Sequence, residues 1–430
     1  MWDWYRDKNI FLTGGSGFVG TALVYRLVTE VPVGHIYILC RGGESKLRKK
    51  WSEWIPDNVV NFMSQPSLVT VVDGDILKAD LGLTSNMQHV LASVVDITIH
   101  AASSINLHSP LSKVADTVIE ASLRTATMTC RWSRMSCFVY VSTAYSNSHL
   151  YALSDGQADV EVEETVYPLD NGQDATEHEL EEVRQRGSST TYENHEFPWP
   201  YAYAKHLTER LLQRVIGAAD RRLLVIRPSI IGPAQSFPYP GFCLPLSSPV
   251  ISVTAGVCLA TSQNVRIGTQ FSEPLRQTST DLVPVDVVVD RLLVHIAAGS
   301  EGAVHAVAGR VGKMPFLRWW NMVIIGMSFN FQDARTEAAW DALDQQDREQ
   351  LQLFSRTIDP DYVFEIGHRQ LWYCIDKFTS KRRLHRHSAH MLYGSWSRCA
   401  LQEFSVDMNS VCVDDNDHHD TDYSQRITKI

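Results

Sequence analysis

The sequence predicts an α/β fold built on a doubly wound parallel sheet, and two observations support this prediction. Short apolar runs alternate with helical patterns from Lys8 to about Arg227, which is the order expected of a parallel sheet covered by helices on both faces. The first apolar run, at residues 10–12, leads into a segment with glycines at positions 14, 17 and 20.

The glycine segment, residues 13–20, is typical of a turn that binds a dinucleotide. A helical pattern begins at Phe18, directly after it. Gly14 permits the tight turn, Gly17 lets backbone N–H groups approach a pyrophosphate, and Gly20 lets the helix pack close to the strand. An ordinary glycine-rich loop is the alternative, but the position between a strand and a helix favours nucleotide binding.

Composition narrows the class of protein. The 430 residues are 44% hydrophobic and 20% charged, as in ordinary globular proteins, and the net charge of -10 argues against nucleic acid or an anionic membrane as the main partner. The 8 cysteines are scattered without a C-x-x-C pair, so we expect free thiols in a reducing compartment. The first strand begins within ten residues of Met1, and no apolar run approaches the ~20 residues of a spanning helix. We therefore expect a cytoplasmic protein with no transmembrane segment.

Further strands are expected at residues 35–40, 68–72, 94–99, 137–141 and 223–226. Arg41 follows the second strand, at the point where an acidic residue would bind the ribose of NAD and an arginine suits the 2′-phosphate of NADP. Arg41 therefore favours NADPH. The basic residues after it, among them Lys49 and Lys50, are equally explained by a solvated helix face.

The expected domain organisation has four parts. Residues 1–235 form the NADP-binding domain, with a polar surface insertion at about 155–196, and residues 236–330 form a smaller substrate lobe. Residues 331–405 form a helical C-terminal region and residues 406–430 a disordered acidic tail. His385, His387 and His390 could suggest a metal site, but no carboxylate or cysteine accompanies them at metal spacing, so we predict none.

Tyr201 and Lys205 are spaced to lie on one face of a helix, about one turn apart. An ammonium beside a phenol lowers the pKa of the phenol from about 10 toward the working range, so the pair can act as an acid. Ser142 and Thr143 follow the strand at 137–141, where a hydroxyl can donate a second hydrogen bond to the same substrate oxygen. Tyr-x-x-x-Lys is common by chance, but its combination with a glycine turn and these strands is a strong signal.

In this order the motifs resemble the extended short-chain dehydrogenase/reductases. Finer features are similar to the fatty acyl-CoA reductase, or male-sterility, branch of that family; they are residues 138–147 (Phe-Val-Tyr-Val-Ser-Thr-Ala-Tyr-Ser-Asn), 163–168, 227–232 with 238–241, and 281–286. The resemblance covers residues 8–310 and implies a Rossmann fold.

The resemblance also implies roles for individual residues. Tyr201 would donate the proton, Lys205 would bind the nicotinamide ribose and tune Tyr201, and Thr143, or Ser142 in its place, would polarise the carbonyl. Asp75 and Ile76 would border the adenine. The implied cofactor-binding residues are Thr13, Gly14, Ser16, Gly17, Phe18, Val19, Gly20, Arg41, Asp75, Ile76, Ala101, Ser103, Tyr201, Lys205, Pro228 and Ile231. Ala121 and Arg124 occupy the positions where the family usually has Asn and Gly, so an asparagine-assisted proton relay is not expected.

The implied activity is NADPH-dependent reduction of a fatty acyl or polyketide-like thioester to the aldehyde and on to the primary alcohol. The alternatives are another extended carbonyl reductase, a nucleotide-sugar epimerase or dehydratase, and a redox-sensing NADP-binding protein without catalysis. The sequence leaves the acyl donor, CoA or carrier protein, and the oligomeric state open. An apolar acyl channel is expected among lobe residues for which ordinary core packing is the alternative, namely Phe237, Tyr239, Phe242, Leu244, Phe316, Trp319 and Trp320.

Overall fold

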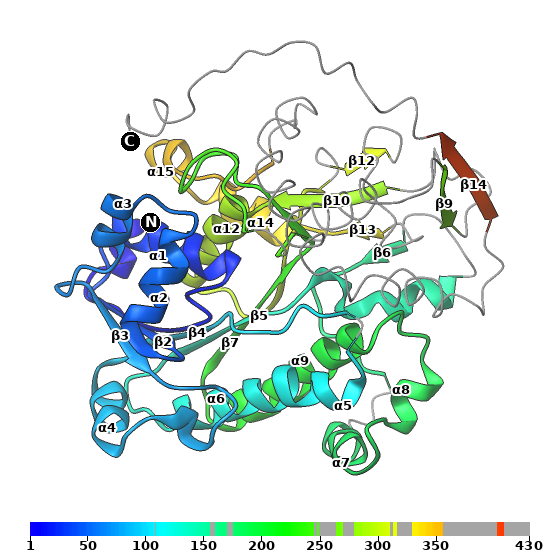
Figure 1. Cartoon of the computed structure of the whole chain (residues 1–430), viewed down its shortest axis with the longest axis horizontal. Coiled ribbons are helices and arrows are strands. Elements are labelled where there is room, and N and C mark those ends of the chain that lie inside the picture. The colour runs from blue at the N-terminus through cyan, green and yellow to red at the C-terminus, as the bar shows by residue number, and fades with distance from the viewer. Residues whose placement is uncertain are drawn as a thin grey trace.

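A central sheet of seven parallel strands organises the computed structural model, which describes residues 1–107, 109–154, 160–169, 175–244, 247–248, 264–269, 279–309, 313–315, 329–355 and 402–407. The strand order is β11-β7-β5-β4-β1-β2-β3 (Figure 1). The bounds are β1 (Asn9–Thr13), β2 (His35–Cys40), β3 (Val69–Asp73), β4 (Ile97–His100), β5 (Cys137–Val141), β7 (Arg222–Pro228) and β11 (Gly302–Ala306).

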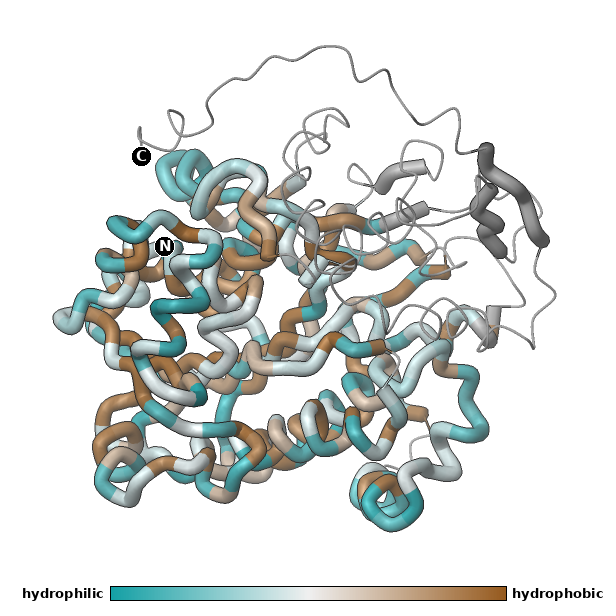
Figure 2. The backbone as a smooth tube through the Cα atoms, viewed as in Figure 1, coloured by the Kyte–Doolittle hydropathy of each residue, from teal (hydrophilic) through white to brown (hydrophobic). Residues whose placement is uncertain are grey.

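Helices cover both faces of this sheet. Ile10 and Leu12 share a hydrophobic cluster with residues of the helices on one face, whereas Phe11 packs with residues of α4 on the other, as the alternation of side chains along a strand requires. One face carries α1 (Phe18–Thr29), α2 (Gly43–Ser52), α3 (Asp57–Met63) and α12 (Val285–Ala297), and the other α4 (Ser85–Val94), α6 (Ala121–Thr129) and α9 (Pro200–Ala218) (Figure 1). Figure 2 shows hydrophobic residues along the central strands and a largely hydrophilic α2 outside them.

The strand order reverses between β1 and β4, because β1 is flanked by β2 on one side and by β4 on the other. Ligands of doubly wound sheets bind at this switch point, outside the carboxyl ends of the strands. The predicted doubly wound parallel sheet is therefore confirmed, and the residues that end β1, β4, β5 and β7 meet at one edge.

The sheet has one strand more than the sequence analysis expected. Residues 285–306 supply α12 and β11, and β11 pairs in parallel with β7 from Leu224 to Pro228. This part of the expected substrate lobe therefore belongs to the central sheet. The sequence disguises it because β11, Gly-Ala-Val-His-Ala, has one apolar side chain larger than alanine and therefore lacks the apolar run by which a buried strand is recognised.

The polar insertion at about 155–196 contains structure of its own. It provides β6 (Val160–Val162), α7 (Thr176–Arg186) and α8 (Thr190–Asn194). Leu180 and Val183 of α7 pack into a hydrophobic cluster with α9, and the buried Glu179 pairs with Arg210 of α9 at 2.5 Å. A charge pair thus fixes a segment whose low apolar content predicted only a surface insertion.

The remaining elements form smaller units. The strands form three small sheets, which are β12-β10-β8, β13-β6 and β14-β9. The strands of these sheets not yet given are β8 (Ile230–Gly232), β9 (Asn264–Thr269), β10 (Ser279–Pro284), β12 (Lys313–Pro315), β13 (Phe329–Phe331) and β14 (Gln402–Asp407). The remaining helices are η1 (Trp2–Tyr5), η2 (Ala79–Gly82), α5 (Leu111–Val114), η3 (Ala115–Glu120), η4 (Ala144–Ser154), α14 (Ala334–Asp341) and α15 (Gln345–Gln350). Across the described ranges, no helix has the length and apolar character needed to cross a membrane.

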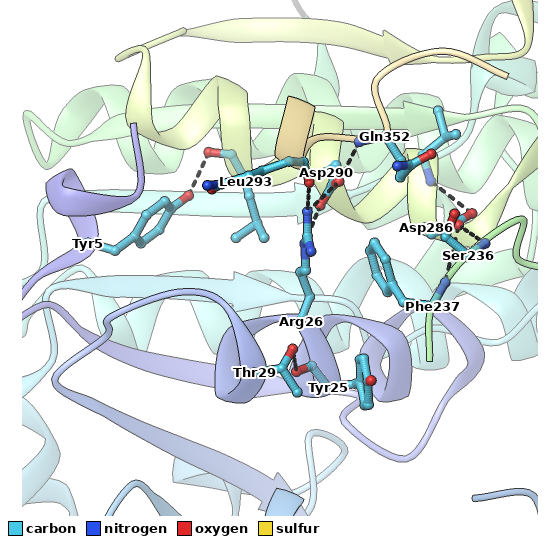
Figure 3. A network of polar contacts seen from close by, with 12 residues as sticks. Tyr5, Tyr25, Arg26, Thr29, Ser236, Phe237, Asp286, Asp290, Leu293 and Gln352 are labelled. Carbon is cyan, nitrogen blue, oxygen red and sulfur yellow. Dashed lines mark hydrogen bonds and ion pairs between the residues drawn. The ribbon is translucent and has the colours of Figure 1, made fainter. Parts of the chain in front are cut away.

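A buried ion pair joins α1 to α12 (Figure 3). The guanidinium of Arg26 donates to both carboxylate oxygens of Asp290, at 2.9 and 3.0 Å. Its cation also lies 4.7 Å from the centre of the Phe237 ring. One helix turn earlier on α12, Asp286 accepts backbone N–H groups from Gln235 and Ser236. These contacts attach the start of the predicted substrate lobe to α1 and α12, which cover the same face of the central sheet.

Replacing Arg26 with alanine is expected to lower the free energy of unfolding by about 3–5 kcal/mol, because it leaves the buried Asp290 carboxylate unpaired. Chemical denaturation measures the change. The matched control is Arg6→Ala, which breaks the pair of Arg6 with Asp3, whose side chains are 62% and 84% exposed; it should cost less than about 1 kcal/mol. Equal losses in the two variants would contradict a special role for the buried pair.

Candidate active site

The glycine turn between β1 and α1 is pressed against the end of β4. Gly14 has a φ of +82°, and a methyl group there would lie 2.6 Å from the carbonyl carbon of Ala101. A methyl group on Gly20 would lie 2.1 Å from the carbonyl oxygen of Gly14. Only glycine fits either position. Gly17 is the N-cap of α1, and its N–H donates to the Gly14 carbonyl at 2.8 Å.

Thr13 lies beneath this turn and is fully buried. Its hydroxyl accepts a hydrogen bond from the N–H of Ala102 at 3.3 Å and lies 2.8 Å from Nδ1 of His100. The same side chain therefore joins the glycine turn to the end of β4. Burial and the charge of Lys205 lower the pKa of His100 to about 3, so the imidazole is neutral.

The other predicted residues of the turn differ in exposure. Phe18 is buried, and Ser16 and Val19 are half-buried. Lys50 Nζ, from the end of α2, donates to the Ser16 hydroxyl at 3.2 Å. Trp51 Nε1 donates to the carbonyl of Gly15 at 3.0 Å. Sequence reasoning assigned neither Lys50 nor Trp51 to the site, because a basic and aromatic helix face gives no sign of which loop it covers.

The expected adenosine side lies at the ends of β2 and β3. Arg41 is exposed directly after β2. The carboxylate of Asp73, which ends β3, accepts the N–H of Gly42 at 2.8 Å. Asp75 accepts the N–H of Leu77 at 3.0 Å, so its side chain shapes its own loop. Half-buried Ile76 follows it.

Tyr201 and Lys205 occupy the first two turns of α9, as predicted. Lys205 is buried, and its Nζ donates to the Val141 carbonyl at the end of β5 at 2.8 Å. The same nitrogen lies 4.6 Å from the centre of the Tyr140 ring and 5.8 Å from that of Tyr201. The start of α9 is thereby held against the strand end that leads into Ser142 and Thr143.

Burial acts on both groups against their charged forms. It raises the pKa of Tyr201 above its ordinary value and lowers that of Lys205 to about 7, an effect that the negative charge of Glu209 opposes. The protein alone therefore does not show the lowered phenol pKa expected from the sequence. The reason is that burial of the phenol disfavours its ionised form.

The two candidate hydroxyls after β5 have different partners. The Thr143 hydroxyl lies at a long 3.5 Å from the Pro228 carbonyl and accepts the N–H of Tyr145 at 3.3 Å. The Ser142 hydroxyl donates to the buried carboxylate of Glu209. In this arrangement the Ser142 proton is already committed to a strong acceptor, so Thr143 is the better placed donor for a substrate oxygen.

The remaining predicted positions line the same edge. Ala101 and Ser103 are half-buried in the segment after β4. Pro228 ends β7, and half-buried Ile231 lies in β8, paired with Val283 of β10. Ala101 and Ser103 thus follow the strand next to the glycine turn, and Pro228 ends the strand next to β5.

Two of its described aromatic residues, Phe237 and Phe242, give the expected acyl channel no support. Phe237 and Phe242 are buried; Phe237 stacks on Tyr25 at a ring distance of 6.3 Å, and Phe242 packs on Phe18 at 5.6 Å. They therefore act as core residues over α1, which is the alternative that the sequence left open. Phe316, Trp319 and Trp320 lie outside the described residues.

The site suits an anionic dinucleotide. The glycines at 14 and 20 let the turn lie against the end of β4, and the first N–H groups of α1 have no acceptor within their helix. Within the described part of the chain, no group of three or more His, Cys, Asp or Glu is placed to hold a metal ion. The histidines at 385, 387 and 390 lie outside it.

Comparison with known proteins identifies the family. A sequence model of a NAD-binding family described as "Male sterility protein" matches residues 12–292. The chain belongs to this family. It thus falls in the fatty acyl-CoA reductase branch of the extended short-chain dehydrogenase/reductases, which confirms the resemblance seen in the sequence, and it uses a nicotinamide cofactor.

Two proteins that are similar to this chain in sequence are fatty acyl-CoA reductases. It is 26% identical to fatty acyl-CoA reductase 2 of Mus musculus over 326 residues (70% of this chain and 56% of the relative). It is 24% identical to fatty acyl-CoA reductase 1 of Xenopus laevis over 300 residues (68% and 55%). The chain thus spans little more than half the length of these relatives.

A solved structure shares the fold. The reductase domain of a nonribosomal peptide synthetase from Mycobacterium tuberculosis is 19% identical, with a TM-score of 0.55, over 86% of this chain and 92% of that one. The similarity extends the family match in sequence to the three-dimensional arrangement of the sheet and its helices.

Gly20→Ala should weaken binding of the nicotinamide nucleotide by about tenfold or more, because the new methyl group would displace the Gly14 carbonyl and reshape the turn. Fluorescence titration of the nucleotide measures the change. Gly217→Ala, in α9, is the matched control, since a methyl group there meets no atom within 4 Å. It should leave binding unchanged and raise the melting temperature slightly. Wild-type affinity in the Gly20 variant would show that the turn does not hold the nucleotide.

Proposed function

We propose that the protein reduces a fatty acyl or polyketide-like thioester with NADPH, first to the aldehyde and then to the primary alcohol. The observation that supports it most directly is the hydrogen bond of Lys205 to Val141. It holds the start of α9 beside the end of β5, two residues before Thr143. Family membership supports the reaction class. Because the chain spans just over half of its relatives, the substrate and the product are part of the proposal.

The residues of the chain divide the work as follows. NADPH, when bound, supplies the hydride. The hydroxyls of Thr143 and Tyr201 donate hydrogen bonds to the carbonyl oxygen and stabilise the negative charge that develops on it. A protonated Lys205 binds the ribose hydroxyls and favours loss of the Tyr201 proton, which opposes the effect of burial on the phenol.

The same donors can serve two reductions. Hydride addition to the thioester carbon gives a tetrahedral hemithioacetal, which expels the thiol and leaves an aldehyde. A second hydride, which requires a second molecule of NADPH in place of the spent NADP+, would reach the aldehyde carbon, and Tyr201 would give its proton to the oxygen to complete the alcohol. Both carbonyls present one oxygen to one pair of donors, so a single site is sufficient.

Two further features belong to the proposal. The exposed Arg41 after β2 supports NADPH as the cofactor, since a guanidinium suits a 2′-phosphate. Cys40, Cys130, Cys137 and Cys243 are free thiols, which supports a reducing compartment, and we keep the cytoplasm as the proposed location.

Turnover of purified protein with NADPH and a panel of acyl-CoA lengths, with product identification, tests the proposal. UDP-sugars and simple ketones are the comparison substrates. Consumption of NADPH with acyl-CoA, accompanied by aldehyde or alcohol, is the expected result. Turnover of a sugar nucleotide alone would instead favour an epimerase or dehydratase, and nucleotide binding without any turnover would favour a redox sensor.

Tyr201→Phe should lower the rate of acyl-CoA reduction by about 10²–10⁴-fold, because it removes the proton donor and keeps the ring. Steady-state and single-turnover kinetics measure the loss, and NADPH affinity should stay within about twofold of wild type. Tyr203→Phe is the matched control, since the Tyr203 hydroxyl faces Ser189 and Glu179, away from the site. A fully active Tyr201 variant would remove this residue from the mechanism.

Arg41→Ala should raise the KM for NADPH by about ten- to a hundredfold and leave the KM for NADH unchanged, because only the phosphate loses a charged partner. Initial rates with the two nucleotides give the ratio. Lys49→Ala, at an exposed position of α2, controls for the general positive potential. The inference for Arg41 fails if both nucleotides weaken equally.

A further inference from the structure

Glu209 is a fully buried carboxylate on α9, one helix turn after Lys205. It accepts the hydroxyl of Ser142 and two N–H groups of Arg227, with Nε of the arginine at 3.1 Å. Both side chains of the ion pair have no exposed surface. Neither the cofactor nor the proton transfer described above requires such a costly group, so its position calls for a physical reason.

The three contacts of Glu209 reach all the elements that position the catalytic groups. Ser142 immediately precedes Thr143, and its N–H also donates to Ile226 of β7 at 2.7 Å. Arg227 immediately precedes Pro228, whose carbonyl faces the Thr143 hydroxyl. Glu209 itself shares α9 with Tyr201 and Lys205. One carboxylate therefore links the ends of β5 and β7 to the catalytic helix.

We infer that Glu209 is a positioning residue of the reductase site, which holds the Ser142–Thr143 turn in register with Tyr201 and supplies, one helix turn from Lys205, a negative charge that favours the ammonium form of Lys205. The first part of this inference, the positioning of Thr143, rests on the proposed function, since the position of that hydroxyl matters only if it binds a substrate carbonyl. The second part needs only nicotinamide binding. Ser142 then acts through Glu209 and does not touch the substrate.

The groups around Lys205 determine whether its charged form is favoured. His100 of β4 is neutral, and Tyr140 of β5 presents its ring. Tyr201 of α9 is a phenol with a raised pKa. Among the described groups that act on its charge, Glu209 is the anion that favours the ammonium, against burial. Arg227 of β7 partly offsets that anion and would become an uncompensated cation without it.

The decisive measurement is the pH dependence of NADPH affinity and of kcat/KM in Glu209→Gln. Glutamine keeps the shape and the acceptor for Ser142 but removes the charge. Because Lys205 must be protonated to hold the ribose, activity and affinity fall as pH rises through its pKa. In the variant this fall should begin about one pH unit lower than in wild type, the size expected of one charge a helix turn away in a partly screened interior.

Glu179→Gln is the matched control. Glu179 is also a buried carboxylate paired with an arginine of α9, Arg210, at 2.5 Å, but it contacts neither Ser142 nor Arg227 in any hydrogen bond of the described residues. It should lose comparable stability and leave the pH profile unmoved. A shift of equal size in both variants, or no shift in Glu209→Gln, would overturn the inference.

A second variant keeps the inference testable if Glu209→Gln does not fold. Ser142→Ala removes the link to Glu209 without changing charge, so kcat should fall severalfold while the pH profile and NADPH affinity stay as in wild type. Wild-type kcat in Ser142→Ala would overturn the positioning role. If wild type binds NADPH but reduces no thioester, the proposed function fails, and the pH profile of NADPH affinity still decides whether Glu209 controls Lys205.

Discussion

The close contact between the glycine turn and the end of β4 is the constraint on which the rest of the structure depends. Because Gly14 lies against the backbone of Ala101, the first and fourth strands end at the same depth. Thr13 and His100 complete this contact from below. With that edge fixed, β5 and β7 extend it on one side, and α9 can bring its first turn to the end of β5. The nucleotide site and the catalytic groups are therefore two parts of one edge.

Much of the architecture could be predicted from local pattern. The strands at 35–40 and 137–141 match the structure residue for residue, since buried parallel strands are continuous apolar runs bounded by turns. Tyr201 and Lys205 were predictable because a four-residue spacing has one meaning on a helix. The glycines were predictable because crowding of the kind seen at Gly20 admits no other residue.

Other features depend on contacts between distant segments and leave no local trace. Ser142 and Thr143 are equivalent in sequence, and only the location of Glu209, 67 positions away along the chain, separates them. The seventh strand is a short Gly-Ala-Val-His-Ala segment with one apolar side chain larger than alanine. The docking of α7 depends on Glu179, a residue that reads as a solvent-exposed charge. A spacing of four residues from Lys205 to Glu209 was visible, but many surface helices show it.

The carboxylate of Asp286 has a consequence for how this protein can diversify. It accepts N–H groups from Gln235, Ser236 and Phe237 while standing at the beginning of α12 (Figure 3). The segment that follows β8 and the segment that leads into α12 are consequently held together by one side chain. Closing a long excursion at its base makes its length nearly neutral for the remainder of the fold. Changes of length between the two ends therefore cost the remainder of the fold little loop-closure free energy.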